Sequence, residues 1–284
     1  MRFLFVNKID SIKGNEIFGS RTFGNDYVMQ YEGPNGTQQI PPGLISEGVG
    51  QLVSWLAIER NNFTGRPVFL FADHIEIHAP VLPGSKVDMR GEIKEMDGET
   101  LVFSGEAHVD GKLVHKIQSS SGYFMPLQDM EDPNVTKQRF ADLTGAGMQL
   151  IDDCAAYDWS SLAGTVAHQE EGKSIVISKT MSPKEPFYAD HFPRFPVTPI
   201  VMINEMIGQA TNKMIGPSAK SLMAKRVSDV KIKNFLKPDE SCKISVKLIE
   251  RGIIEGKDTI QTIAEIEKEG RKILRGRYIY EIGG

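Results

Sequence analysis

Apolar and polar residues follow two different periods along this chain, and each period occurs in two separate blocks. Residues 42–60 and 198–214 carry apolar side chains at intervals of three and four, which predicts an amphipathic helix in each. Other segments alternate with period two, which predicts half-buried strands, and turns such as Asp97-Gly98 suit antiparallel hairpins. The predicted strands span residues 2–9, 16–23, 68–71, 74–78, 86–95, 100–109 and 113–124 in the first block, and 174–181, 221–227, 230–235, 242–250, 259–268 and 272–280 in the second.

The two blocks repeat one order of elements. Glu47 and Gln51 on the first predicted helix correspond to Glu205 and Gln209 on the second. Turn residues later in each block correspond at nearly the same offset. Several matches in the same order predict an internal duplication.

The duplication predicts two halves, residues 1–127 and 148–284, joined by a linker at residues 128–147. The linker is acidic and polar and contains Pro133, which is typical of a surface connection. Residues 148–157 are expected to begin the second half with a strand. Because one helix cannot cover a whole curved sheet, we expect the halves to pair into one continuous antiparallel sheet, which is an α+β fold.

Composition narrows the class of protein. A chain of 284 residues with 40% hydrophobic and 25% charged residues is typical of a soluble globular protein. Its net charge of −4 argues against general nucleic-acid binding. The two cysteines, Cys154 and Cys242, predict free thiols rather than a disulfide framework. No segment is suited to a signal peptide or a membrane span, so we expect a cytoplasmic protein.

His191-Phe192-Pro193 lies in the predicted loop before the second helix, and Glu205 follows on that helix. An imidazole titrates near neutral pH, so it is suited to removing a proton from a substrate. A carboxyl group is suited to returning one if it stays protonated. The spacing therefore predicts acid–base chemistry between a loop and a helix.

Glu47 is a second candidate for the proton donor. Leu44 and Trp55 flank it on the helix, and burial against apolar neighbours raises the pKa of a carboxyl group. Backbone amides at a helix N-terminus, at Gly43 or Ile200, can polarise a carbonyl group because they lack intrahelical partners. Further expected substrate-site residues are Gln51 and Gln209, which can orient the carboxylates, and Met202 and Met206, on the floor of an apolar tunnel.

The segment from His191 to Pro199, followed by Glu205, resembles the signature of bacterial β-hydroxyacyl-acyl-carrier-protein dehydratases. In the first half, Pro42-Gly43 and Glu47 resemble the same template, so that the resemblance covers almost the whole chain in two copies. It implies the hotdog fold, in which an antiparallel sheet wraps a long helix. For this chain it implies a double hotdog, with two long central helices wrapped by one continuous curved antiparallel sheet.

In relatives with one hotdog per chain, each active site takes its histidine from one subunit and its carboxylate from the other. On this chain, the resemblance implies that His191 pairs with Glu47 across the internal interface. Glu205 would then face the first-half position that lacks a histidine, at Glu32 or Gly33.

The chain departs from the template at two positions. Arg194 stands where a glycine usually follows His-Phe-Pro, and we expect it to be a surface arginine. Ile200 stands where a glycine usually begins the helix, so its fit to a carbonyl-binding role is in doubt.

The resemblance implies a hydro-lyase that eliminates water from (3R)-3-hydroxyacyl thioesters on acyl carrier protein, giving trans-2-enoyl thioesters in fatty-acid or polyketide-type biosynthesis. The substrate would be carried on the phosphopantetheine of the carrier protein, without a metal or redox cofactor. A hotdog thioesterase and a non-catalytic subunit that binds acyl groups or the carrier protein are the alternatives. The acyl chain length and any homo-oligomer stay open.

Two further groups of polar residues have both a functional and a plain interpretation. His74, Glu76 and His78 alternate on one predicted strand face, which suits a metal site or, more often, a solvated face. A set of cations could dock an acidic carrier protein, or form a solvated strand surface. Its members are Lys220, Lys225, Arg226, Lys231 and Lys233.

Overall fold

The computed structural model describes residues 3–33, 36–150, 156–216 and 222–283. The elements, in chain order, are β1 (Lys8–Lys13), β2 (Glu16–Thr22), β3 (Tyr31–Glu32), β4 (Gln38–Gln39), α1 (Pro42–Arg60), β5 (Gly65–Ile77), β6 (Lys86–Met96), β7 (Thr100–Val109), β8 (Lys112–Pro126), α2 (Leu127–Met130), α3 (Pro133–Thr144), η1 (Trp159–Leu162), β9 (Thr165–Glu170), β10 (Ser174–Thr180), η2 (Pro186–Ala189), α4 (Ile200–Ile215), β11 (Leu222–Ile232), β12 (Ser241–Ile254), β13 (Lys257–Lys268) and β14 (Arg271–Ile282).

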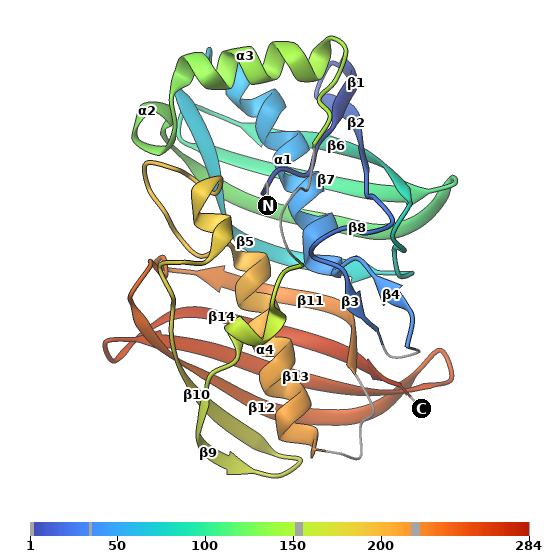
Figure 1. The fold of residues 1–284 in the computed structure, drawn as a ribbon, viewed down its shortest axis with the longest axis vertical. Coiled ribbons are helices and arrows are strands. Elements are labelled where there is room, and N and C mark those ends of the chain that lie inside the picture. The colour runs from blue at the N-terminus through green and yellow to red at the C-terminus, as the bar shows by residue number, and fades with distance from the viewer. Residues whose placement is uncertain (1–2, 34–35, 151–155, 217–221, 284) are drawn as a thin grey trace.

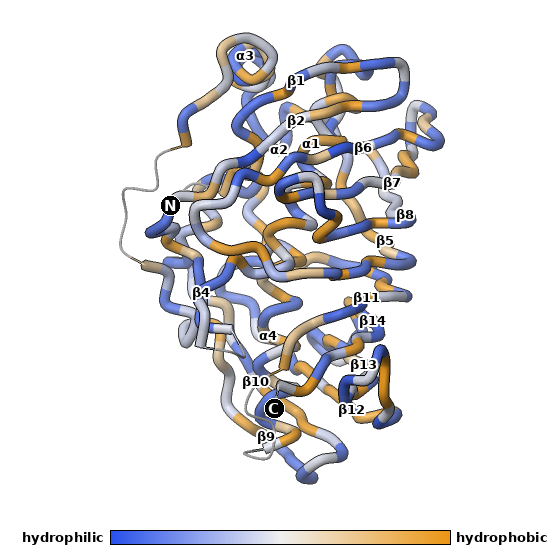
Figure 2. Tube along the Cα trace, turned by 90° about the vertical axis from the view of Figure 1, so that its right-hand side faces the viewer, coloured by the Kyte–Doolittle hydropathy of each residue, from blue (hydrophilic) through white to orange (hydrophobic). Residues whose placement is uncertain are grey.

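One curved antiparallel sheet of twelve strands forms the body of the molecule. Its strand order is β1-β2-β6-β7-β8-β5-β11-β14-β13-β12-β10-β9. The sheet curves behind α1 and α4, which lie on the same side of it (Figure 1). In the perpendicular view, the strands follow one another from β1 to β9 along the long axis (Figure 2). The expected double hotdog is confirmed.

The two halves join at the edge strands β5 and β11. These strands pair antiparallel, with Ile75 opposite Val227 and Ala72 opposite Val230. Each half would otherwise leave a strand edge unpaired, with exposed backbone donors and acceptors. The pairing removes both edges and makes one sheet of two. The exact boundaries of the halves, placed above at residues 127 and 148, stay a prediction.

The polar stripe of α1 faces the second half rather than solvent. Helix α1 contacts α4 as well as β5, β6 and β7, and most of its residues are buried. Glu47 and Gln51, on the side away from the apolar face, are only partly buried because they border an internal cavity. In the paired halves, the polar face of α1 therefore lines an internal cavity instead of facing solvent.

Most of the predicted elements match the structure. The predicted helix at 42–60 is α1, and the strand predicted at 100–109 is β7. The strands predicted at 68–71 and 74–78 are one long strand, β5, with register shifts inside it. Those predicted at 221–227 and 230–235 likewise overlap one strand, β11. A bulge breaks the alternation of a strand without ending it, which explains both false divisions.

The structure differs from the sequence-based expectations at four places. The strand predicted at residues 2–9 is wrong, because Phe3 to Val6 lie outside the sheet and β1 begins at Lys8. Strand β9 was not predicted, because all six of its residues are exposed and show no alternation. The linker contains two helices, α2 and α3. Of the strand expected at 148–157, residues 148–150 and 156–157 are not in a strand, and the rest lies outside the described residues.

Glycines on three strands let α1 lie close to the sheet. A Cβ atom at Gly19 would lie 2.8 Å from Leu52 Cδ1, and one at Gly105 would lie 2.5 Å from Val49 Cγ1. A Cβ at Gly91 would overlap Val53 Cγ2. The strands therefore need glycine where the helix packs on them.

This packing predicts a coupling between Gly91 and Val53. Gly91→Ala should lower the free energy of unfolding by about 1–3 kcal/mol, because it overpacks the core. The double variant Gly91→Ala/Val53→Ala should lose less than the sum of the two single variants, because the second change restores the room. Urea unfolding measures all three. Gly98→Ala is the matched control, since a Cβ there would meet nothing within 4 Å; strictly additive losses would contradict the coupling.

Candidate active site

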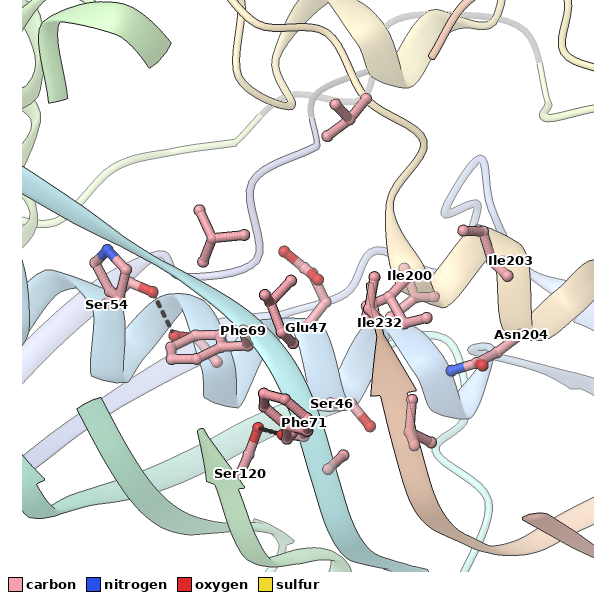
Figure 3. Close-up of a pocket in the computed structure, with 18 of the residues that line it drawn as sticks. Ser46, Glu47, Ser54, Phe69, Phe71, Ser120, Ile200, Ile203, Asn204 and Ile232 are labelled. Carbon is pink, nitrogen blue, oxygen red and sulfur yellow. Dashed lines mark hydrogen bonds between the residues drawn. The ribbon is translucent and has the colours of Figure 1, made fainter. Parts of the chain in front are cut away.

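A cavity of about 150 Å³ lies between the two halves, beside the junction of β5 and β11. Its walls are largely apolar and come from α1, α4, β5 and β11, with Phe69, Phe71, Ile203 and Ile232 among them (Figure 3). A few polar side chains face the same space, including Glu47, Gln51, Arg66 and His191. An apolar cavity with a few convergent polar groups is suited to binding a small ligand or an acyl chain.

His191 has a defined tautomer. Its Nδ1 lies 3.0 Å from the carbonyl oxygen of Val197, and a carbonyl can only accept, so Nδ1 carries the proton. The basic lone pair is therefore on Nε2. The ring packs edge-on against Phe3, with 5.4 Å between centroids. Burial lowers the pKa of His191 to about 3, and the positive charge of Arg66 acts in the same direction. The imidazole is thus held neutral, ready to accept a proton.

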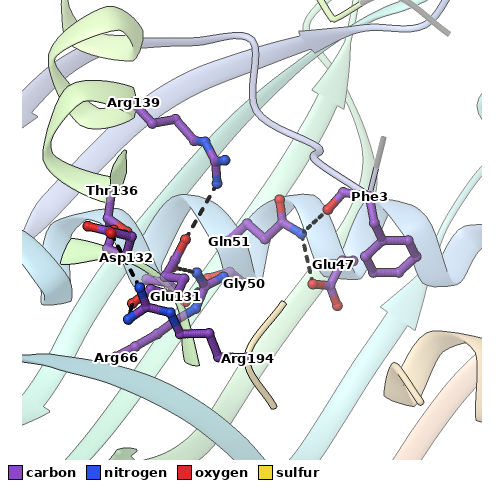
Figure 4. A network of polar contacts seen from close by, with 11 residues as sticks. Phe3, Glu47, Gly50, Gln51, Arg66, Glu131, Asp132, Thr136, Arg139 and Arg194 are labelled. Carbon is purple, nitrogen blue, oxygen red and sulfur yellow. Dashed lines mark hydrogen bonds and ion pairs between the residues drawn. The ribbon is translucent and has the colours of Figure 1, made fainter. Parts of the chain in front are cut away.

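Glu47 accepts a hydrogen bond from Gln51, which lies one turn further along α1. The amide of Gln51 accepts from the Phe5 backbone N–H at 2.9 Å, which fixes which end of the side chain is nitrogen. That nitrogen donates to Glu47 Oε1 at 2.9 Å and to the Phe3 carbonyl at 3.2 Å (Figure 4). Burial raises the pKa of Glu47, while the hydrogen bond from Gln51 and the charge of Arg66 oppose that rise. The net effect favours a protonated carboxyl group.

The cavity brings together residues from both halves. Glu47 and Gln51 come from α1, whereas His191 and Ile200 come from the loop before α4 and its first residue. The first amides of a helix lack intrahelical partners, so the N-terminus of α4 offers donors beside this cavity. Gly43, the other expected amide position, lines a second cavity instead. Met202 and Met206 are buried in the core and line neither cavity, so the expected tunnel floor is formed by other residues.

The second cavity has a volume of about 210 Å³ and contains Glu205 and Gln209. Gln209 Nε2 donates to the Trp159 carbonyl at 2.9 Å, so it does not hold the carboxyl group as Gln51 does. Burial alone raises the pKa of Glu205 to about 7. Tyr31, next to the expected vacant position at Glu32 or Gly33, lines this cavity. The two acids thus lie in separate cavities, and the histidine shares its cavity with Glu47.

Arg194 is exposed, as expected of a surface arginine, and it also contacts the segment between the halves. Its backbone N–H donates to the Met130 carbonyl at 2.9 Å, and its Nη1 donates to the Gln128 carbonyl at 2.8 Å. Its Nη2 also lies 3.3 Å from Asp132 Oδ2. The arginine therefore fastens the loop that carries His191 to the segment between the halves.

A second arginine stabilises the same loop from the other side. The Arg66 guanidinium lies 4.9 Å from the centroid of the Phe192 ring and pairs with the buried carboxylate of Glu131, which also pairs with Arg139 (Figure 4). Phe192 has φ of 57°, a left-handed conformation that is costly for an aromatic residue, so the loop needs such support. No sequence pattern indicates this network, because Arg66, Glu131 and Phe192 are far apart along the chain.

Comparisons with known proteins identify the family of this chain. A family model described as ApeI-like dehydratase matches residues 167–261, which contain His191 and Glu205. The 3-hydroxyacyl-acyl-carrier-protein dehydratase FabZ of Campylobacter lari is 32% identical over 120 residues, which are 39% of this chain and 81% of that protein. This chain belongs to the hotdog dehydratase family. Two other dehydratases of the same name are matched over only 63% and 57% of their own length, at 32% and 31% identity.

Solved structures with the same fold cover nearly the whole chain. A MaoC-like dehydratase superposes with a TM-score of 0.56 at 12% identity, covering 95% of this chain and 98% of that one. The 12:0-ACP thioesterase of Umbellularia californica superposes with a TM-score of 0.51 at 10% identity, covering 93% of each chain. At these identities, the likeness shows the hotdog fold and says nothing about the reaction.

The remaining candidate residues have local partners or lie outside the site. Glu76 is hydrogen-bonded to His74 at 2.9 Å and lies 3.3 Å from His78. In the described part of the chain, no three His, Cys, Asp or Glu side chains form a metal-binding group. Cys242 is buried, and Cys154 lies outside the described residues.

The cations proposed for carrier docking are only partly free. Lys225 lies 3.8 Å from Glu281, and Arg226 lies opposite Glu76 in the register of β5 and β11, where its positive charge helps to lower the pKa of Glu76. Lys231 and Lys233 are exposed, and Lys220 lies outside the described residues. No helix in the described ranges is long and apolar enough to cross a membrane.

Two buried histidines predict how stability depends on pH. Burial lowers the pKa of both His115 and His191 from 6.5 to about 3, so the unfolded chain binds protons that the folded chain does not. The free energy of unfolding should therefore fall as the pH is lowered from 6.5 towards 3. His115→Gln removes one such group and should make the fall shallower, by up to about 1.4 kcal/mol per pH unit. Urea unfolding at pH 7 and pH 5 checks this. His168→Gln, an exposed change on β9, is the control, and equal slopes in all three proteins would contradict the prediction.

Proposed function

We propose that this chain is a hydro-lyase that removes water from (3R)-3-hydroxyacyl thioesters to give trans-2-enoyl thioesters. The observation that carries the proposal is the shared cavity of His191 and Glu47, one held neutral and one favoured in its protonated form. These are the protonation states that an elimination needs before it begins. Membership of the dehydratase family supports the same reaction.

In the proposed step, His191 Nε2 takes the proton from C2 of the acyl chain. The electrons of that bond move toward the thioester carbonyl, whose developing charge is stabilised by amides at the start of α4. The C2–C3 double bond forms as the 3-hydroxyl group leaves with the proton of Glu47, which yields water. His191 then loses its proton and Glu47 regains one, by direct transfer or by exchange with solvent, and the site is restored. The reverse sequence hydrates an enoyl thioester.

The apolar walls suit an acyl chain. Phe69, Ile203 and Ile232 can contact the hydrocarbon while the polar end of the cavity holds the thioester. The dehydratase relatives are named for substrates carried on acyl carrier protein. We therefore propose a phosphopantetheine-linked substrate, fatty-acid or polyketide-type synthesis, and a carrier protein that docks on the exposed part of the basic set, Lys231 and Lys233. All steps of the proposed route use side chains and amides of this chain.

Replacing the acid and base predicts a ranking of activities. His191→Ala should lower the rate of crotonyl-thioester hydration by about 100- to 10,000-fold, because it removes the base. Glu47→Gln should cost a similar factor, whereas its counterpart Glu205→Gln should cost little, because Glu205 lies in the other cavity. The assay measures hydration as a decrease in the absorbance of the enoyl thioester. A larger loss in Glu205→Gln than in Glu47→Gln would remove the cross-half site.

The arginine that fastens the loop predicts a loss of turnover rather than of folding. Arg194→Ala should lower kcat by about 10- to 100-fold by misplacing the imidazole, with a small change in thermal stability. Arg194→Lys should recover part of that loss. Arg271→Ala, a change at an exposed arginine on β14, is the control. Unchanged kcat in Arg194→Ala would show that the loop keeps its geometry without the arginine.

The two alternative functions are separated by the same assay. A thioesterase would release free thiol from acyl thioesters, which a thiol reagent detects. Any loss of enoyl absorbance would then occur at the same rate as the release of thiol. A non-catalytic subunit would bind carrier-linked acyl groups without either signal. Enoyl hydration without thiol release is the expected result.

A further inference from the structure

The second cavity repeats the layout of the active site, but no histidine is among the described residues that line it. It is lined by Glu205 of α4 and Gly43 at the start of α1, as the first is lined by Glu47 of α1 and Ile200 at the start of α4. Each acid therefore faces the N-terminus of the opposite helix. In the step proposed for the first cavity, the helix amides contact the thioester carbonyl and the carboxyl group contacts the 3-hydroxyl group.

The second cavity also keeps room beside its acid. Gly208 lies three residues after Glu205, as Gly50 lies three residues after Glu47, and each glycine lines its own cavity. A Cβ at Gly208 would meet nothing within 4 Å, whereas one at Gly50 would contact Phe69 Cε2 at 3.6 Å. The space beside Glu205 is thus at least as open as that beside Glu47.

Where the first cavity has an imidazole, the described lining of the second has the phenol groups of Tyr31, Tyr278 and Tyr280. Tyr31 lines it, and burial together with the charge of Glu205 raises the pKa of Tyr31. A phenol that stays protonated can donate a hydrogen bond but cannot remove a proton from carbon at neutral pH. Gln209 donates to Trp159 instead of to Glu205, and among the described residues burial is the one cause that raises the pKa of Glu205, with no hydrogen bond acting on it. That group is left to a ligand.

We propose that the second cavity binds an acyl thioester without converting it. The ligand class rests on the function proposed above. The backbone N–H of Gly43 would donate a hydrogen bond to the thioester carbonyl, and Glu205 and Tyr31 would hold the 3-hydroxyl group. With no base near C2, the 3-hydroxyl group of the bound ligand is not eliminated as water. The chain therefore has two acyl-binding sites, and only the first converts its substrate.

The test counts ligands by isothermal titration calorimetry. The probe is 3-hydroxybutyryl pantetheine with an amide in place of the thioester, because it does not react. A short chain is used because Ser46 and Asn204 line both cavities, so long tails would meet there. Wild type should bind two equivalents. Gly208→Leu and its matched control Gly50→Leu should each bind one, and the double variant none.

A second variant keeps the test independent of folding. Glu205→Gln is nearly isosteric and should weaken the second equivalent at least 10-fold while the first stays as in wild type. Thermal unfolding shows whether each glycine variant is folded. One equivalent or none in wild type, or two in Gly208→Leu, would overturn the proposal. If two equivalents bind but crotonyl thioesters are not hydrated, the dehydratase proposal fails and the second acyl site stands.

Discussion

The pairing of β5 with β11 is the interaction on which the rest of the structure depends. Each strand is the edge of its own half, and the pair closes both edges into one sheet. This places α1 and α4 side by side, so that each polar helix stripe faces the loop and helix terminus of the other half. Without the pairing, Glu47 and His191 would belong to two separate modules and would not line the same cavity.

A single physical cause sets both groups for the proposed chemistry. Desolvation disfavours charge on any side chain, so in this cavity it lowers the pKa of His191 and raises that of Glu47. In water near neutral pH the carboxyl group would be charged and the imidazole partly so. Burial at the interface favours the neutral form of both groups, which places a neutral imidazole and a carboxyl group with a raised pKa in one cavity. Arg66 reinforces the first effect and moderates the second.

Duplication allowed the two cavities to differ. The loop with His191 is fastened by Arg194 and Arg66 to the segment between the halves, so this segment supports the site as well as connecting the chain. The corresponding first-half region carries Tyr31 and the short β3–β4 pair. In a symmetric dimer both sites would have to change together. A fused pair can keep one reactive site and modify the other.

The sequence by itself determined the elements and the family. The period of three to four residues located α1, the alternation of period two located β7 and most other strands, and the repeated Glu-Gln pairs revealed the two halves. The His-Phe-Pro loop indicated the dehydratase family, because the residues of that motif are close together in the sequence and can be recognised without the fold.

Only the tertiary structure decided which groups meet. Phe3 to Val6 look like a strand because all four are apolar, yet they leave the sheet and support Gln51. Gly43 and Ile200 are equivalent in sequence, and packing alone assigns them to different cavities. The contacts of Arg194 with the linker join distant segments and leave no periodic trace. Local patterns follow from neighbouring residues, whereas a site depends on which surfaces fold against each other.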